Sequence, residues 1–273
     1  MHHNPVMRKE PGSIASARLW KRQSQGRPRI PFFILVAAVL GLFSQPATAI
    51  QKETTAEKAE NLEKQVKGGL FNFWDFDKQS PGGVPQGFVA LTYGDGQEGL
   101  WRIEAEPAAP SFPHAVLAVS ACSTCSQLLI AKDLKYEYPD LAVRLHQAGG
   151  HGSMGMVFGL RDRMNFYAAM VDLAGKTLRV VRVVDGKETV LGEAPLKMKP
   201  VEWHTFRVQR NTIISKDFIE TVFDGQLTLS VEDQSLGLGQ VGLLVRGDMS
   251  VHFDSFHAAP LYSHRPLSPP AAY

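Results

Sequence analysis

The chain has 273 residues, of which 44% are hydrophobic and 21% charged, and its formal net charge is +2. This composition is typical of one globular domain of the larger all-β kind, once the two ends of the chain are set aside. Seven of the basic residues lie before residue 30, so the remainder of the chain is slightly acidic. That distribution of charge excludes nucleic acid as an expected partner.

The first predicted element is an apolar run that is preceded by basic residues. Basic residues up to Arg29 precede an apolar stretch at residues 30–43, and "ATA" ending at Ala49 has the small-x-small arrangement that a signal peptidase reads. The run is shorter than the about 20 residues that a membrane-spanning helix needs. Residues 1–49 are therefore expected to be a signal peptide with a long basic leader. We expect a periplasmic or secreted protein that meets a membrane only during export.

Three segments follow the expected cleavage point. Residues 50–69 mix Glu and Lys on a helix-prone background, which predicts a charged helical spacer. From residue 70 onwards, aromatic and β-branched runs alternate with turn residues, which predicts a β-domain over 70–261. Residues 262–273 hold too much proline and too little apolar surface to fold alone, so we expect a disordered tail.

The β-domain is expected to contain strands and no helix. The predicted strands are residues 71–76, 87–91, 100–104, 115–119, 141–147, 154–160, 166–173, 177–184, 188–191, 204–209, 218–223, 226–231, 241–245 and 250–256. The pairs Asp185-Gly186 and Asp224-Gly225 predict two-residue hairpin turns, because Gly and Asp tolerate positive φ. In "TLRVVRVV" the alternation is imperfect, so both faces of that strand should be partly covered. These features predict an all-β fold, a two-sheet antiparallel β-sandwich of jelly-roll type.

Both cysteines lie in "SACSTCSQ", at Cys122 and Cys125. In an oxidising compartment such a pair is usually joined, so a local disulfide is favoured. Idle thiols, half of a metal site and thioredoxin-like redox chemistry remain open. Redox chemistry of that kind calls for a pair at the start of a helix, whereas the neighbouring Ser and Thr favour a loop.

Several pieces of the β-domain follow one another in a recognisable order: "GLRDRMNFYAAMVD", "EWHTFRVQR", "FDGQ" and "GQVGLLVRGDMSVHFDSF". In this order they resemble the concanavalin A-like jelly-roll domains of bacterial exported proteins related to the 3-keto-disaccharide hydrolase family, which has laminarin-binding and laminarinase-like relatives. The resemblance covers roughly residues 70–261. It implies two curved sheets with sugar-related ligands on the concave face. Trp203 and Phe206 have the size to fill the space between such sheets.

The sequence departs from the laminarinase-type relatives where catalysis would occur. Those relatives use a compact Glu, Asp and Glu cluster on one strand, and nothing here reproduces it. Retaining hydrolysis needs two carboxyl groups about 5 to 5.5 Å apart. The nearest pairs are Glu104 with Glu106 and Asp75 with Asp77, and the first runs into "PAAP", which indicates a strand end. A non-catalytic module is the favoured interpretation.

A sugar site needs an aromatic ring for stacking together with Asn, Arg or His side chains for the hydroxyl groups. The expected ligand-binding residues are Trp101, His146, Arg161, Asn165, Tyr167 and Arg207. The strongest candidates for contact with a ligand flank one short connection, and they are Arg161, Asn165 and Tyr167. Asn165 alternatively caps a hairpin turn with Asp162, and Tyr167 alternatively covers an edge of the core. His204 is interpreted as a sheet-surface histidine.

Two acidic residues near the ends of the β-domain suggest a structural calcium ion. Sandwich domains of this kind tend to bring their terminal strands side by side, which would bring Asp77 or Asp75 in "FWDFD" close to Asp254 in "HFDSF". Calcium favours six to eight oxygen ligands and tolerates irregular geometry. Solvated carboxylates are the alternative interpretation.

Three functions follow from these features. The favoured one is an exported carbohydrate-binding module whose partner is a glycan or small sugar. The alternatives are a glycoside hydrolase-like enzyme acting on 3-keto-disaccharides or related sugars, and an accessory envelope protein that binds a protein partner.

Overall fold

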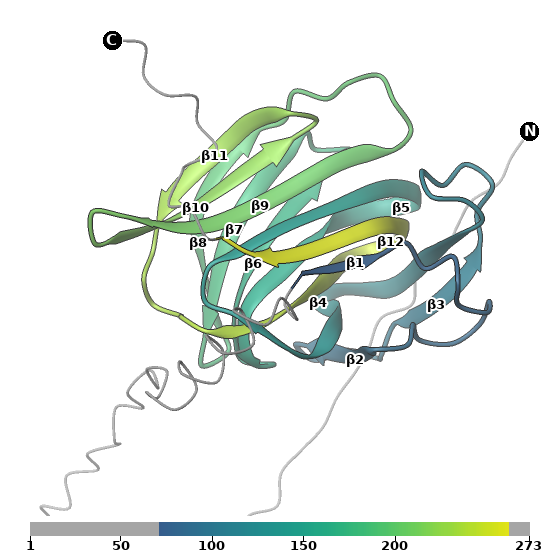
Figure 1. The fold of residues 1–273 in the computed structure, drawn as a ribbon, viewed down its shortest axis with the longest axis horizontal. Helices are drawn as coiled ribbons and strands as arrows, with labels where there is room; N and C mark the ends of the chain where they lie inside the picture. The colour runs from purple at the N-terminus through teal and green to yellow at the C-terminus, as the bar shows by residue number, and fades with distance from the viewer. Residues whose placement is uncertain (1–70, 262–273) are drawn as a thin grey trace, which may run out of the picture. The chain divides into compact units, whose positions relative to one another are not determined.

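The computed structural model describes residues 71–261, and every regular element in that range is a β-strand (Figure 1). The predicted signal peptide, the spacer and the tail lie outside the described residues. The strands are β1 (Asn72–Trp74), β2 (Phe88–Tyr93), β3 (Leu100–Ala105), β4 (His114–Tyr136), β5 (Pro139–Asp162), β6 (Asn165–Asp172), β7 (Thr177–Val184), β8 (Lys187–Pro195), β9 (His204–Ile213), β10 (Lys216–Phe223), β11 (Gln226–Glu232) and β12 (Gly239–Pro260). Within 71–261 no helix suited to crossing a membrane is found.

The strands form two antiparallel layers that share three long strands. Layer one contains β3, the first part of β4, the second part of β12, the first part of β5, and then β9, β10 and β11. Layer two contains β2, the second part of β4, the first part of β12, the second part of β5, and then β6, β7 and β8. The short strand β1 pairs with the end of β12. This arrangement confirms the predicted antiparallel β-sandwich.

Glycine allows the long strands to bend from one layer into the other. Gly150 has a φ of 77°, and a Cβ atom there would lie 2.2 Å from the carbonyl oxygen of Asp248 on β12. Gly247 on β12 has a φ of 109° at the same corner. The sequence prediction divided β5 and β12 into two strands each and ended a strand of β4 at residue 119. This division was wrong, because the chain bends at these corners and the ladder continues on both sides.

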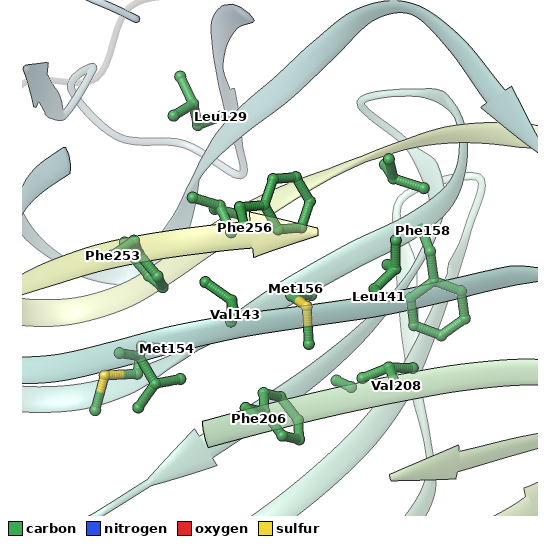
Figure 2. Packing of buried hydrophobic residues seen from close by; sticks show 14 of the residues in the cluster. Leu129, Leu141, Val143, Met154, Met156, Phe158, Phe206, Val208, Phe253 and Phe256 are labelled. Carbon is green, nitrogen blue, oxygen red and sulfur yellow. The ribbon is translucent and has the colours of Figure 1, made fainter. Parts of the chain in front are cut away.

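The main core lies between the two layers (Figure 2). Layer one contributes Val143, Phe206 and Phe253, and layer two contributes Met156 and Phe158, each at most 1% exposed. They occupy alternate positions on their strands, so each layer turns one face inward. Burial of each such side chain contributes roughly 1.5–3 kcal/mol relative to leaving it in water.

Layer two buries its other face as well. A second cluster on that face contains Leu128, Ile130, Val157, Leu160, Phe166, Ala168, Met170, Val181, Val183 and Leu244. The ring of Tyr93 meets the ring of Phe166 edge-on at 5.1 Å, and its hydroxyl group donates a hydrogen bond to the carbonyl oxygen of Gly186 at 3.0 Å. Because β2 and the β7–β8 turn lie at opposite edges of layer two, these contacts show that the layer curls toward its outward face.

The local turn and face predictions for β7 are confirmed. Asp185 and Gly186 both have positive φ, at 50° and 74°, in the two-residue turn between β7 and β8. Successive residues of β7 face opposite sides, so Leu178 and Val180 lie in the main core while Val181 and Val183 lie in the second cluster. Both faces of β7 are therefore covered, as the imperfect alternation predicted.

Candidate functional site

The residues expected to bind a ligand do not converge on one groove. Trp101 is 2% exposed in the main core, where its ring stacks on Phe253 with centroids 6.0 Å apart. Arg207 lies on the outward face of layer one and makes two hydrogen bonds to Asp140, at 2.8 and 2.5 Å. His146 lies on the same outward face as Arg207 but contacts a different set of side chains. These three side chains belong to different environments.

Asn165 and Arg161 lie near the hairpin between β5 and β6. The Asn165 amide donates to both carboxylate oxygens of Asp162, at 3.0 and 3.1 Å, and accepts a hydrogen bond from the backbone of Asp185. Asn165 therefore joins two neighbouring turns, which matches the capping interpretation. The guanidinium group of Arg161 lies beside Gly237 in the connection before β12.

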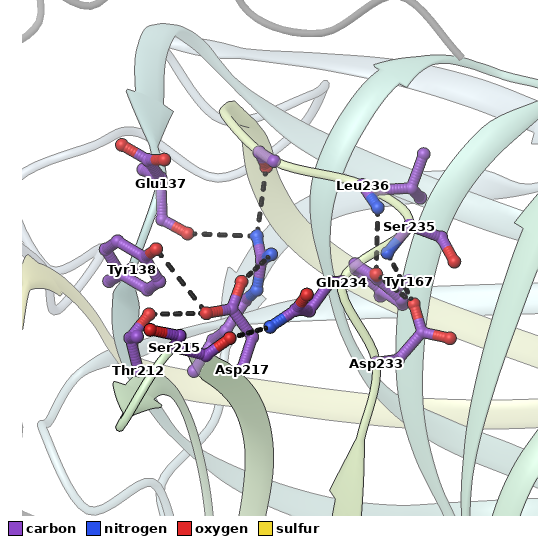
Figure 3. A network of polar contacts seen from close by, with 12 residues as sticks. Glu137, Tyr138, Tyr167, Thr212, Ser215, Asp217, Asp233, Gln234, Ser235 and Leu236 are labelled. Carbon is purple, nitrogen blue, oxygen red and sulfur yellow. Dashed lines mark hydrogen bonds and ion pairs between the residues drawn. The ribbon is translucent and has the colours of Figure 1, made fainter. Parts of the chain in front are cut away.

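Tyr167 contacts a buried polar network centred on Arg210. Figure 3 labels Tyr167 together with Tyr138 and Asp217, which also contact Arg210. Arg210, which is 2% exposed, donates to Asp217 at 2.7 Å and to the carbonyl oxygens of Glu137 and Gly237. Its guanidinium carbon lies 5.5 Å from the ring of Tyr138 and 5.7 Å from the ring of Tyr167. This geometry is suited to cation–π attraction.

The hydroxyl group of Tyr167 is held by the connection that follows β11. It donates to Asp233 at 2.5 Å and accepts from the backbone of Leu236 at 2.9 Å. Burial, together with the hydrogen bond to Asp233, raises the pKa of Tyr167 above its ordinary value. Apart from the unpaired Arg210 Nε, the polar groups described above bond to one another or to the backbone, so we interpret the network as a structural element that fastens the 233–238 connection to the sandwich.

A different set of side chains meets on the outward face of layer one. We name it the His252 cluster, and its members are Glu104, Glu106, His146, Glu202, Trp203 and His252. Strand register explains the convergence: His252 on β12 lies directly opposite His146 on β5 and opposite Leu117 on β4. Leu117 in turn lies opposite Arg102 on β3, two residues before Glu104. Because alternate residues share a face, these side chains leave the layer on the same side.

Three aromatic rings form the centre of the cluster. The ring of Trp203 lies 5.4 Å from that of His146 and 6.3 Å from that of His252, and the two imidazole rings are 5.8 Å apart. The indole packs on Ala115 of β4 and on Ala109 in the loop that follows β3. The backbone oxygen of Trp203 accepts a hydrogen bond from Arg144 at 3.3 Å.

Carboxylates surround these rings. His252 Nε2 lies 2.7 Å from Glu104 Oε1, and with that nitrogen protonated the imidazole donates a hydrogen bond. Glu106 Oε2 lies 3.5 Å from His252 Nδ1, which is an electrostatic contact without hydrogen-bond geometry. Glu202, the most exposed member, lies 3.5 Å from His146 Nε2.

The environment shifts two pKa values in the cluster. Burial acts to raise the pKa of Glu104, but hydrogen bonds from His252 and Arg102 outweigh it, and the pKa lies below its ordinary value. Burial lowers the pKa of His146, and the nearby Glu202 opposes this effect only in part. Glu104 is thus held as a carboxylate and His146 as a neutral imidazole near pH 7.

The His252 cluster also concentrates unpaired polar atoms. Nine buried side-chain nitrogen or oxygen atoms of the described residues lack a hydrogen-bond partner. Three of them lie in the cluster, Trp203 Nε1, His146 Nδ1 and His252 Nδ1, and a fourth, Arg144 Nε, lies next to it. Buried polar groups normally have partners, so a concentration of unpaired ones in one place calls for an explanation. For this reason we take the His252 cluster as the candidate functional site.

Sequence reasoning missed this cluster because it assigned two neighbouring residues to the wrong faces. Trp203 was expected between the sheets, yet it packs on the outward side of layer one. His204 was expected on the surface, yet it is 6% exposed, bonds to Asp224 at 2.8 Å and stacks on Phe223. The sequence shows that Trp203 and His204, as consecutive residues, face opposite sides of the layer, but it does not show which of the two faces the core.

The aspartates expected to bind calcium make separate contacts. Asp254 is fully buried and accepts hydrogen bonds at 2.6 Å from both the backbone nitrogen and the hydroxyl group of Ser111. Burial raises the pKa of Asp254. Asp77 accepts from the backbone of His114 at 3.1 Å. Residues 71–261 contain no group of three or more His, Cys, Asp or Glu side chains arranged to hold a metal ion, and the calcium site stays a prediction.

Comparisons with known proteins place the fold. No protein-family model matches the chain, and no curated protein sequence matches it. The chain is similar to the solved carbohydrate-binding module CBM66 from Bacillus subtilis, with a TM-score of 0.51 and 15% identity, covering 63% of this chain and 95% of that chain. The match is weaker to a Bacillus subtilis protein of unknown function with a galectin-like fold (TM-score 0.46, 10% identity, 63% and 88% covered) and to the Caenorhabditis elegans galectin LEC-6 (TM-score 0.35, 12% identity, 53% and 90% covered).

The similarity to the CBM66 module, at 15% identity, shows the fold alone. The chain is thus an antiparallel β-sandwich of jelly-roll type, and its resemblance to the 3-keto-disaccharide hydrolase family stays a prediction.

Proposed function

We propose that the protein is an exported carbohydrate-binding module and that its ligand site is the His252 cluster. The observation that carries the proposal is the combination of three aromatic rings with four unpaired buried polar atoms. Sugars present flat C–H faces that stack on rings and hydroxyl groups that bond to polar atoms. The similarity in fold to a carbohydrate-binding module supports the same class of ligand.

The unpaired atoms specify the chemistry of the ligand. Trp203 Nε1 and Arg144 Nε only donate, so the ligand must accept hydrogen bonds there. Glu104, Glu106 and Glu202 only accept when ionised, so the same ligand must also donate. A hydroxyl group does both. Three carboxylates around the rings repel an anionic ligand, which favours a neutral sugar.

The concave outward face of layer two is a less suitable place for a sugar. The residues of the second cluster fill that face with apolar side chains, most of them fully buried. A polyhydroxylated ligand there would lose hydrogen bonds to water without gaining others. The polar side chains Arg246 and Glu188 on that face are already paired with each other.

The arrangement favours binding over hydrolysis. Glu104 and Glu106 both face the ring of His252, one at each nitrogen. A retaining glycosidase needs its two carboxyl groups to flank the scissile bond. Here the imidazole occupies the space between the two carboxylates. Purified protein is therefore expected to release no product from laminarin or from 3-keto-glucosides.

Access to the site depends on the connection between β8 and β9. The unpaired atoms are buried, and Glu202, near the end of this connection at residues 196–203, contacts His146 at 3.5 Å. The side chain of Glu202 is 62% exposed, and its partner His146 is a neutral imidazole near pH 7, so the contact is weaker than the about 0–1 kcal/mol of an exposed ion pair. A ligand can displace such a contact at small cost.

Affinity electrophoresis in gels with a panel of neutral and acidic polysaccharides, together with a glycan array, tests the proposal. We expect retardation by at least one neutral polymer. Trp203→Phe keeps an aromatic ring but removes the Nε1 donor, and it should weaken binding about tenfold, the effect of one lost hydrogen bond. Arg207→Met, on the same face but paired with Asp140, is the control and should bind normally. Absence of retardation by every polymer would refute the proposal.

Export is part of the proposal and has its own test. Expression of the full chain in a bacterial host, followed by fractionation and N-terminal sequencing, should give a processed protein outside the cytoplasm that begins at Ile50. An unprocessed chain in the cytoplasm would contradict it.

A further inference from the structure

The two cysteines form a disulfide at the corner where β4 passes from layer one to layer two. Cys122 pairs with Gly247 of β12, and the next paired residue of β4 is Ser126, opposite Arg246. Residues 123–125 therefore bulge out of the ladder. Cys122 and Cys125 are joined across this bulge, and Cys122 is half-buried while Cys125 is fully buried.

Each sulfur atom receives a hydrogen bond from the protein. The backbone N–H of Cys125 donates to Cys122 Sγ at 3.0 Å. The side-chain amide of Gln127 donates to Cys125 Sγ at 3.2 Å. Hydrogen bonds to sulfur favour the thiolate over the thiol, because they stabilise the charged form.

The amide of Gln127 is fixed in position by its other contacts. Its oxygen accepts hydrogen bonds from Thr92 at 2.9 Å and from the backbone of Gly99 at 2.8 Å. Its nitrogen also donates to the carbonyl oxygen of Gln97 at 2.8 Å. With the oxygen and one N–H occupied, the second N–H is directed at Cys125. The donor is thus held ready for charge that develops on that sulfur.

We propose that Cys122–Cys125 is a site of thiol–disulfide exchange with dithiols, and that Cys122 is the sulfur attacked. A thiolate of the dithiol attacks Cys122 Sγ, the S–S bond breaks, and Cys125 leaves as a thiolate stabilised by Gln127. The second thiol of the reductant, as its thiolate, then attacks the reductant's first sulfur, which is bonded to Cys122 in the mixed disulfide. This S–S bond breaks, and Cys122 is released as a thiolate. Two electrons pass from the dithiol to the protein, and the dithiol becomes a cyclic disulfide.

The exchange alters the loop between β2 and β3. A Cβ atom at Gly96 would lie 2.5 Å from Cys125 Sγ and 2.6 Å from Cys122 Sγ, so the backbone of this loop packs directly on the two sulfur atoms. Breaking the S–S bond separates them to non-bonded distance, and the loop must then move. Reduction is therefore expected to loosen the backbone of residues 94–99, which are exposed apart from half-buried Gly99, a change that is independent of carbohydrate binding.

Reduction kinetics of the full chain test the proposal. Dithiothreitol should reduce the folded protein at a rate that does not depend on added urea below the unfolding transition. A brief reaction with reduced glutathione, quenched with acid and followed by peptide mass spectrometry, should find the first mixed disulfide on Cys122. Reduction only under unfolding conditions, or a first adduct on Cys125, would overturn the proposal.

A matched pair of variants separates the Gln127 contribution from general loosening of the fold. Gln127→Leu should slow reduction roughly tenfold, the factor for one hydrogen bond to a charged sulfur. Gln147→Leu removes an exposed amide that donates to Gly150 at a neighbouring corner, and it should leave the rate unchanged. Hydrogen exchange of residues 94–99 should rise on reduction of the wild-type protein. An unchanged exchange pattern would refute the coupling of the bond to the loop.

Discussion

Replacement of Arg210 by Met tests how strongly the buried network holds the sandwich together. The substitution keeps much of the side-chain volume but removes the guanidinium group. It deletes the ion pair with Asp217 and two hydrogen bonds to carbonyl oxygens. It also removes the cation that lies near the rings of Tyr138 and Tyr167.

The expected loss follows from burial. Arg210 and Asp217 have side-chain exposures of 3% and 10%, so removal of one partner leaves the other charge without compensation. Breaking a buried ion pair in this way costs about 3–5 kcal/mol. Because a whole domain is stable by only about 5–15 kcal/mol, the variant should be severely destabilised. The Arg210→Met, Asp217→Leu double variant should be more stable than the single variant, since it removes the uncompensated carboxylate.

Urea unfolding followed by tryptophan fluorescence measures this loss. Arg207→Met is the control, because Arg207 makes a comparable two-bond contact with Asp140 but has a 40% exposed side chain. An exposed pair contributes only about 0–1 kcal/mol. Equal losses in the two variants, or a loss below about 1 kcal/mol for Arg210→Met, would show that burial does not set the strength of this network.

Three further predictions concern titration and packing. Burial raises the pKa of Tyr136 from 10.0 to about 12, so the stability it contributes should be present below pH 10 and lost between pH 10 and about 12. Tyr136→Phe should reduce the fall of the urea midpoints over that range, and the remaining fall comes from other tyrosines with a raised pKa, such as Tyr167. The lowered pKa of Glu104, which bonds to His252, means that wild type should lose stability on acidification below pH 4.5. Glu104→Gln should make this loss smaller, and the remaining loss comes from other carboxylates with a lowered pKa, such as Asp233. A Cβ at Gly242 would lie 2.1 Å from a backbone oxygen, so Gly242→Ala should lower the free energy of unfolding by at least about 1–3 kcal/mol in the same assay, while Gly149→Ala, with open space, should be neutral.

The sequence alone determined the local features of this protein. Alternation of apolar residues predicted strands, and Asp185-Gly186 and Asp224-Gly225 predicted tight turns, because positive φ is a property of one or two residues. Together these signals were enough to predict the sandwich. The imperfect alternation of β7 also predicted cover on both of its faces.

Only the tertiary structure decided which side chains meet. Glu104, His146 and His252 come from three strands and converge through register, and register depends on pairings between distant parts of the chain. Alternation fixes that Trp203 and His204 point to opposite sides, but it does not fix which side is the core. The glycine corners of β5 and β12 look like turns in the sequence, because a residue with positive φ serves equally in a hairpin and in a bend within a strand. The candidate site depends on these long-range choices, and so it appeared only in the folded protein.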